Sequence, residues 1–174
     1  SGKQYKNYAK RLSKHAKNSK NYGYIFENIS ALCDFLSVKF ELGKRLRKAY
    51  REKDFSELEI IYKDIKRAEI KLKKFEKTLK NRWNEDFTPQ GYDVLDMRIG
   101  ALYQRLKTAR EKLRDYLDDK ALSIPELECE NMPLCKWDDE LLSSMKWKDI
   151  VTVNSGGSVT IGSVTNGIVP SGIV

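Results

Sequence analysis

The sequence predicts an all-α protein: an antiparallel helical bundle of three long helices and a shorter N-terminal helix, with a short C-terminal tail that is irregular or forms a β-hairpin. Two stretches repeat apolar residues at spacings of three and four, which places those residues on one face of a helix. Each stripe must be buried against another surface, so the pattern also predicts an interaction surface. The stripes are Leu58, Ile61, Ile65, Ala68, Leu72, Phe75 and Leu79, and Leu95, Ile99, Leu102, Leu106, Ala109, Leu113 and Tyr116.

The first predicted helix covers residues 3–20 and is strongly basic. Residues 1–26 contain seven Lys or Arg and no acid, whereas the rest of the chain carries 26 basic and 25 acidic residues. One interpretation is an arm that binds nucleic acid or another anionic surface. The favoured interpretation is a solvated helix face, or a helix whose acidic neighbour lies elsewhere.

Three longer helices follow in the prediction. The second covers residues 24–51 and carries two adjacent apolar stripes, which is typical of a central helix. The third begins after Asp54, an expected N-cap with Glu57 three residues later, and ends near Trp83. The fourth begins at Thr88-Pro89, since threonine caps helices and proline fits a first turn, and runs to about residue 119.

The character of the sequence changes after residue 120. Residues 123–126 predict another short helix, and residues 151–174 contain no charged side chain. Apolar alternation around Asn154–Gly157 fits a β-hairpin, and the alternative is an uncharged tail ordered only by a neighbour. We therefore predict three parts: a basic N-terminal helix (1–23), a helical bundle (24–149) and an uncharged tail (150–174).

The sequence contains few candidate catalytic, metal-binding or phosphate-binding residues. His15 is the single histidine, and a lone histidine on a helical stripe is more often a packing residue than a base. Cys129 and Cys135 lack the spacing of a zinc site, and no glycine-rich phosphate loop occurs. We expect no catalytic residue, no metal and no cofactor. The odd number of cysteines and the lack of a signal-peptide or membrane-spanning pattern favour a reducing, cytoplasmic compartment without membrane attachment.

One segment, residues 91–100, is less ordinary. Asp93 and Asp96 fall in the first turns of the predicted fourth helix, where the helix dipole favours anions, and Arg98 follows closely. Gly100 is a poor helix former inside this helix, at ~1 kcal/mol relative to alanine, which suggests close approach by another backbone or a ring. We predict Asp93, Asp96 and Arg98 as contact residues toward another domain or subunit. The alternative is helix capping plus one tight helix crossing.

This segment resembles a known signature. It reads GYDVLDMRIG and is similar to the pattern G-[FY]-D-V-x-D-x-R-x-G in the C-terminal helical domain of bacterial family-20 glycoside hydrolases, the β-N-acetylhexosaminidases of streptococcal type. Residues 30–43 resemble the long central helix of that domain, and residues 147–154 resemble its W-x-x-I-x-T-x-N ending. The resemblance covers about residues 24–154; the lysine-rich start, residues 121–136 and the tail after Asn154 depart from it.

The resemblance implies a function through association. In that family a (β/α)8 barrel carries the catalytic Asp–Glu pair, and this chain contains no barrel, so no catalytic residue is assigned. The resemblance implies an accessory domain that packs on a catalytic barrel and forms a homodimer, and that is not catalytic alone. Two alternatives stay open: a basic helical module that binds nucleic acid or protein, with nucleic acid the less expected partner, and a hydrolase with an unrecognised site.

Overall fold

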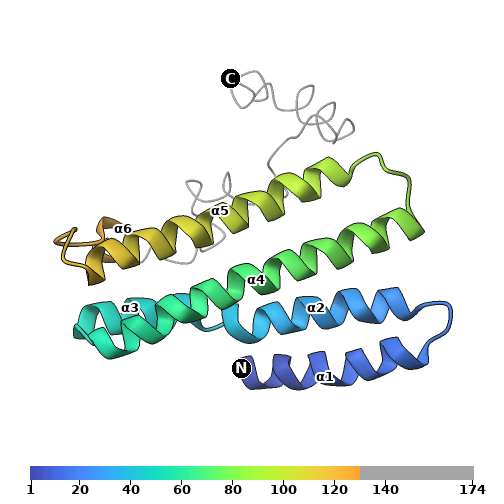
Figure 1. The fold of residues 1–174 in the computed structure, drawn as a ribbon, viewed down its shortest axis with the longest axis horizontal. Coiled ribbons are helices and arrows are strands. Elements are labelled where there is room, and N and C mark those ends of the chain that lie inside the picture. The colour runs from blue at the N-terminus through green and yellow to red at the C-terminus, as the bar shows by residue number, and fades with distance from the viewer. Residues whose placement is uncertain (130–174) are drawn as a thin grey trace, which may run out of the picture. The chain divides into compact units, whose positions relative to one another are not determined.

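The computed structural model describes residues 1–129, and all regular structure within them is helical (Figure 1). This confirms the all-α prediction. The predicted hairpin or irregular tail of residues 150–174 lies outside the described residues, as does Cys135. None of the described helices is both long enough and apolar enough to cross a membrane. The helices are α1 (Gly2–Asn18), α2 (Gly23–Lys39), α3 (Leu42–Glu52), α4 (Phe55–Asp86), α5 (Tyr92–Leu117) and α6 (Pro125–Glu128).

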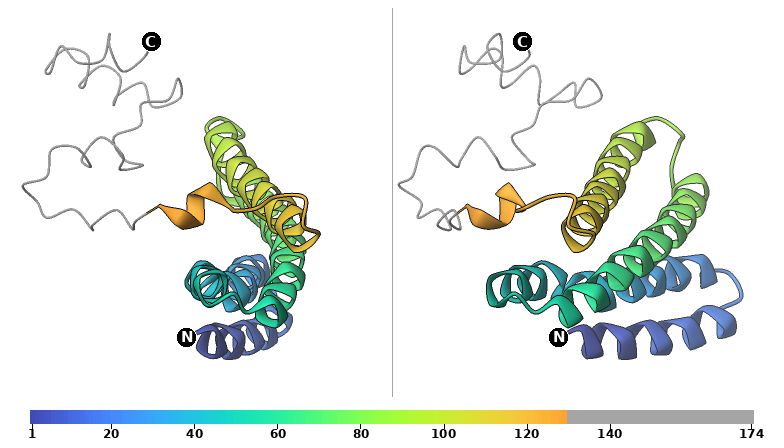
Figure 2. Two further views of the ribbon diagram at one scale, coloured as in Figure 1. Left: turned by 90° about the vertical axis from the view of Figure 1, so that its left-hand side faces the viewer. Right: turned by 60° about the vertical axis from the view of Figure 1, so that its left-hand side comes forward.

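The long helices of residues 1–129 run up and down in a row rather than around a closed centre. Helix α1 lies against α2, both α2 and α3 lie against α4, and α5 packs on α4 (Figure 1). Seen from the end, α4 has α2 and α3 on one side and α5 on the other, and α6 lies on the α3 side of α5 (Figure 2). A row of this kind leaves parts of α1, α4 and α5 uncovered.

The core follows the stripe of α4. Its first five apolar positions are at most 1% exposed, because α2, α3 and α5 pack on α4. The last two positions, Phe75 and Leu79, are half-buried. The stripe of α5 contributes Ile99, Leu106 and Leu113 to the same core, so both predicted stripes are confirmed.

The prediction of one continuous helix over residues 24–51 is wrong, because the chain bends at Phe40 and Glu41 and forms two helices. Helix α2 ends at Lys39 and α3 begins at Leu42. No proline lies at the bend. The tertiary contacts explain it: the ring of Phe40 contacts Tyr5 of α1, with ring centroids 5.3 Å apart, while Leu42 is buried at 4% exposure. The bend therefore lets α2 stay against α1 while α3 turns onto α4.

The sequence predicted the starts of α4 and α5 from capping residues, and the structure confirms the first prediction but not the second. Asp54 caps α4 as predicted, since its carboxylate accepts a hydrogen bond from the Glu57 N–H at 3.0 Å. The predicted start of α5 at Thr88-Pro89 is wrong, because α5 begins at Tyr92 after Gly91. The backbone φ of Gly91 is 92°, a left-handed conformation that favours glycine. The Trp83 indole donates a hydrogen bond to the Thr88 carbonyl at 2.7 Å, which holds Thr88 in the connecting turn.

Candidate interaction site on helix α5

The three predicted contact residues lie in the first turns of α5 and are all exposed. Asp93 and Asp96 are three residues apart, so they share one side of the helix. Arg98 follows Asp96 by two residues, and side chains at that spacing do not face each other. The structure thus brings the two aspartates together and places Arg98 on another side of α5.

Two further residues share the side of the aspartates. Met97 and Gly100 continue the spacing of three and four from Asp93, and the Met97 side chain is 58% exposed. We call Asp93, Asp96, Met97 and Gly100 the α5 outer face. It combines two carboxylates with an exposed apolar side chain, a composition suited to contact with another protein surface.

Gly100 has no packing role in the described part of the chain. A Cβ atom added to Gly100 would meet no atom within 4 Å. The expectation that another backbone or a ring approaches Gly100 is therefore wrong for residues 1–129. The glycine weakens α5 without an intramolecular reason among these residues, because glycine inside a helix costs ~1 kcal/mol relative to alanine.

Tyr92 anchors the start of α5 beneath the outer face. Its side chain is 8% exposed, and its ring centroid lies 5.9 Å from that of Trp83 on α4. The buried Tyr92 hydroxyl makes no hydrogen bond of good geometry among the described residues, although the Asp96 carboxylate lies near it. Burial, followed by the negative charges of Asp96 and Glu76, raises the pKa of Tyr92 to about 12. Tyr92 therefore holds the first turn of α5 on α4, while the aspartates beside it are exposed.

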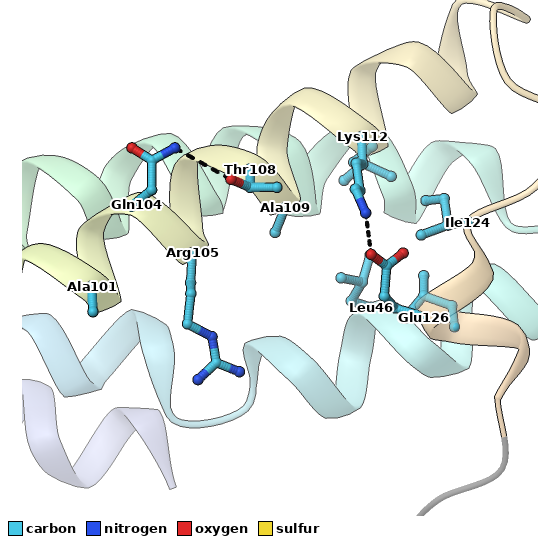
Figure 3. A pocket seen from close by; sticks show the side chains of 11 residues that line it. Leu46, Ala101, Gln104, Arg105, Thr108, Ala109, Lys112, Ile124 and Glu126 are labelled. Atoms are coloured by element: carbon cyan, nitrogen blue, oxygen red, sulfur yellow. Dashed lines mark hydrogen bonds and ion pairs between the residues drawn. The ribbon is translucent and has the colours of Figure 1, made fainter. Parts of the chain in front are cut away.

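A groove lies on a different side of α5, between α3, α5 and α6 (Figure 3). Its volume is about 560 Å³. Arg105 extends from α5 into the space, and Lys112 forms an ion pair with Glu126 across one end, which lowers the pKa of Glu126. The lining is mainly apolar or small: Leu46, Ala101, Gln104, Arg105, Thr108, Ala109, Lys112, Leu113, Ile124, Glu126 and Leu127.

The sequence analysis did not predict this groove. The signal for it is the run of small side chains Ala101, Thr108 and Ala109 at helical spacing on α5, where larger apolar residues would fill the space. Arg98 precedes Arg105 by seven residues, two helical turns, so both arginines project from the groove side of α5. Helix α5 therefore presents two separate surfaces, an acidic outer face and an apolar groove side with arginines.

The other reactive side chains stay apart from α5. No group of three or more potential metal ligands occurs within residues 1–129. His15 on α1 contacts the ring of Phe26, with centroids 5.8 Å apart. Within residues 1–129 neither Cys33 nor Cys129 forms a disulfide: Cys33 is buried, which raises the pKa of its thiol, and Cys129 is exposed. His15 and Cys33 therefore have packing contacts, and Cys129 is in contact with solvent.

Comparison with known families adds one match. The model of the family described as Glycoside Hydrolase 20C C-terminal domain matches residues 1–145. The match begins at residue 1 and so includes α1, which the sequence resemblance left out. It also includes α5 with the outer face and the groove. No curated protein matches the chain.

Proposed function

Because this chain belongs to the family of glycoside hydrolase 20C C-terminal domains, we propose that it is the accessory helical domain of a β-N-acetylhexosaminidase and is not catalytic by itself. Its role is to bind the catalytic (β/α)8 barrel of the parent protein. The reaction then belongs to the barrel, and this chain contributes a surface. The cytoplasm remains the proposed compartment, in line with the lack of a disulfide between Cys33 and Cys129 within residues 1–129.

Gly100 is the observation that carries the proposed attachment through α5. It is exposed, it lies inside a long helix, and nothing in residues 1–129 occupies the space beside it. A partner that packs closely on α5 supplies the reason for a residue without a side chain. The rest of the α5 outer face fits such a partner, since Met97 offers an apolar contact and Asp93 and Asp96 offer carboxylates.

The position of α5 in the row of helices also favours the α5 outer face as the binding surface. Among the long helices α5 packs on α4, so its outer side stays open. Asp93 lies in the first helical turn, where unsatisfied N–H groups give a partial positive charge that stabilises the carboxylate. Arg98 lies on the groove side of α5, so a partner contacts it only if that partner also covers this second edge of the helix.

A homodimer is the second candidate. Met97 and Phe87 are 58% and 56% exposed at the same end of the α4–α5 pair, and apolar side chains of this kind also suit a second copy of the chain. Sedimentation equilibrium of the purified chain separates the two candidates. A monomer that binds a catalytic barrel supports the first, and a stable dimer that no longer binds the barrel supports the second.

The direct test uses a family-20 catalytic barrel encoded beside this chain and expressed separately. We expect calorimetry to detect binding, and we expect the chain alone to release no chromophore from a nitrophenyl N-acetylglucosaminide. The variant D93K/D96K should weaken binding about tenfold or more. The control E41K/E52K makes the same change in charge on exposed residues of the α3 region and should leave binding unchanged. Equal effects of both variants, or turnover by the chain alone, would contradict the proposal.

A further inference from the structure

Helices α1 and α4 carry two matching rows of lysine. On α1 the row is Lys3, Lys6, Lys10, Lys14 and Lys17, with spacings of three and four, so these side chains share one face. On α4 the same spacing runs through Lys63, Lys66, Ile70, Lys74 and Lys77. Every residue of both rows is exposed.

The two rows meet across α2. A groove of about 470 Å³ is lined by Lys6, Lys10 and Lys14 from α1 and by Lys74 from α4. The members of the α4 row fall between the positions of the buried stripe, which includes Ile61 and Ile65, so the row lies on another side of that helix. We call the two rows and this groove the basic face.

The lysines of the basic face are not used in ion pairs within residues 1–129. No ion pair among these residues involves a lysine of either row. The nearby cation–carboxylate pairs use other side chains, as with Lys71 and Asp34 at 2.5 Å and Arg67 and Asp64 at 3.2 Å. Clustered charge of one sign raises the local potential and attracts a partner of opposite sign.

Two details decide which anionic partner fits. Ile70 is 63% exposed in the middle of the α4 row, and an apolar side chain there contacts protein but does nothing for a phosphate backbone. Glu27 lines the groove between the rows, where its carboxylate repels a uniform polyanion, whereas the Asp34 carboxylate there is paired with Lys71. A protein surface can place carboxylates over the lysines and leave an apolar group over Ile70.

We propose that the basic face binds an acidic surface of a protein partner, with Ile70 as the apolar contact in the middle of the α4 row. This surface is separate from the α5 outer face and does not depend on attachment through α5. The electrostatic part of the contact weakens with salt, because the Debye length falls below ~10 Å above 0.1 M.

The test uses a fluorescent helical peptide of about 20 residues with glutamates at spacings of three and four and a central leucine. The intact chain should bind it in low salt and lose affinity about tenfold or more on raising the salt from about 50 to 200 mM. A glutamine version of the peptide should not bind. A dT oligonucleotide and a DNA duplex of about 20 nucleotides per strand serve as phosphate probes.

The variant K66E/K74E/K77E should lose at least about tenfold in peptide affinity, and I70S about threefold or more. The control K44E/K48E/R51E changes the charge equally on exposed residues of α3 and should bind as the parent does. Circular dichroism should show all variants folded, because every altered side chain is exposed. Failure of the glutamate peptide to bind, equal losses in both triple variants, or tighter binding of either DNA would overturn the proposal.

Discussion

Arg45 of α3 holds a buried carboxylate of α4: its Nη1 donates to Oδ2 of Asp64 at 2.8 Å. The Asp64 side chain is only 9% exposed, whereas that of Arg45 is 35% exposed. Arg45 also donates through Nε to the Glu57 carboxylate at 2.9 Å. One guanidinium therefore connects α3 with two turns of α4, just after the bend at Phe40 and Glu41.

The variant R45M should lower the free energy of unfolding by about 1–2 kcal/mol. This is less than the roughly 3–5 kcal/mol for a fully buried pair, because Arg67 also contacts Asp64, at 3.2 Å. Urea denaturation followed by circular dichroism measures the change. The neighbouring variant K44M removes an exposed cation and should change little, and a similar loss in K44M would contradict this account.

The core of α4 can be tested with two isoleucines on one helix. Ile65 is 1% exposed, and I65A should lower the free energy of unfolding by about 2–5 kcal/mol through lost burial and a cavity. Ile70 is 63% exposed, and I70A should stay within about 0.5 kcal/mol of the parent. Thermal and urea unfolding of both variants give the comparison, and similar values for the two would place the core elsewhere.

The variant G100A separates stability from association. Alanine should stabilise α5 by about 0.5–1 kcal/mol, since its Cβ meets no atom within 4 Å in the described residues. The same Cβ should weaken binding to the catalytic barrel. The control is G43A in α3, where an added Cβ also meets nothing within 4 Å and where barrel binding should not change. Unchanged barrel binding by G100A would remove the main support for docking on α5.

The variant Y92F removes a buried hydroxyl that lies near the Asp96 carboxylate but makes no hydrogen bond of good geometry within residues 1–129. We expect it to raise the free energy of unfolding by about 1 kcal/mol, because an unpaired buried polar group is destabilising. The control Y8F changes a tyrosine that is 49% exposed and should have little effect. Loss of stability in Y92F, measured in urea, would mean that the hydroxyl has a partner after all.

Stability at acid pH should depend on Asp118. Hydrogen bonds from Arg114, and then from Lys120, lower the pKa of Asp118 to about 2 from the ordinary 3.8. The folded pKa lies below the unfolded one, so the stabilisation is present above about pH 4 and is lost as the pH falls through about 2. The free energies of unfolding of D118N and the parent should therefore differ at neutral pH and converge at the acid end of this range. A difference that stays constant throughout would contradict the assignment.

Local sequence spacing accounts for most of the helical pattern. The stripes of α4 and α5, the Asp54 cap and the short helix after Ser123 all follow from spacing and hydrogen bonds between residues a few positions apart. The separation of Arg98 from Asp96 is also a local property, since two residues correspond to more than half a helical turn.

The bend at Phe40 and Glu41 and the late start of α5 do not follow from local spacing. The bend depends on Tyr5 and Arg45, which contact partners on other helices, and the start at Tyr92 depends on the Trp83 hydrogen bond to Thr88. The first two contacts join residues far apart in the sequence, and the Trp83 hydrogen bond to Thr88 joins residues five positions apart across a turn. The helical repeat predicts none of them.

Amino-acid order alone determined which side chains share a face of each helix, because that depends only on the helical repeat. Tertiary packing decided which of those faces are covered. Within residues 1–129, helices arranged in a row bury the stripe of α4 and leave the α5 outer face, its groove and the lysines of α1 and α4 open. The reason is that burial depends on which helices become neighbours, and that choice is made by the sum of many contacts between distant segments.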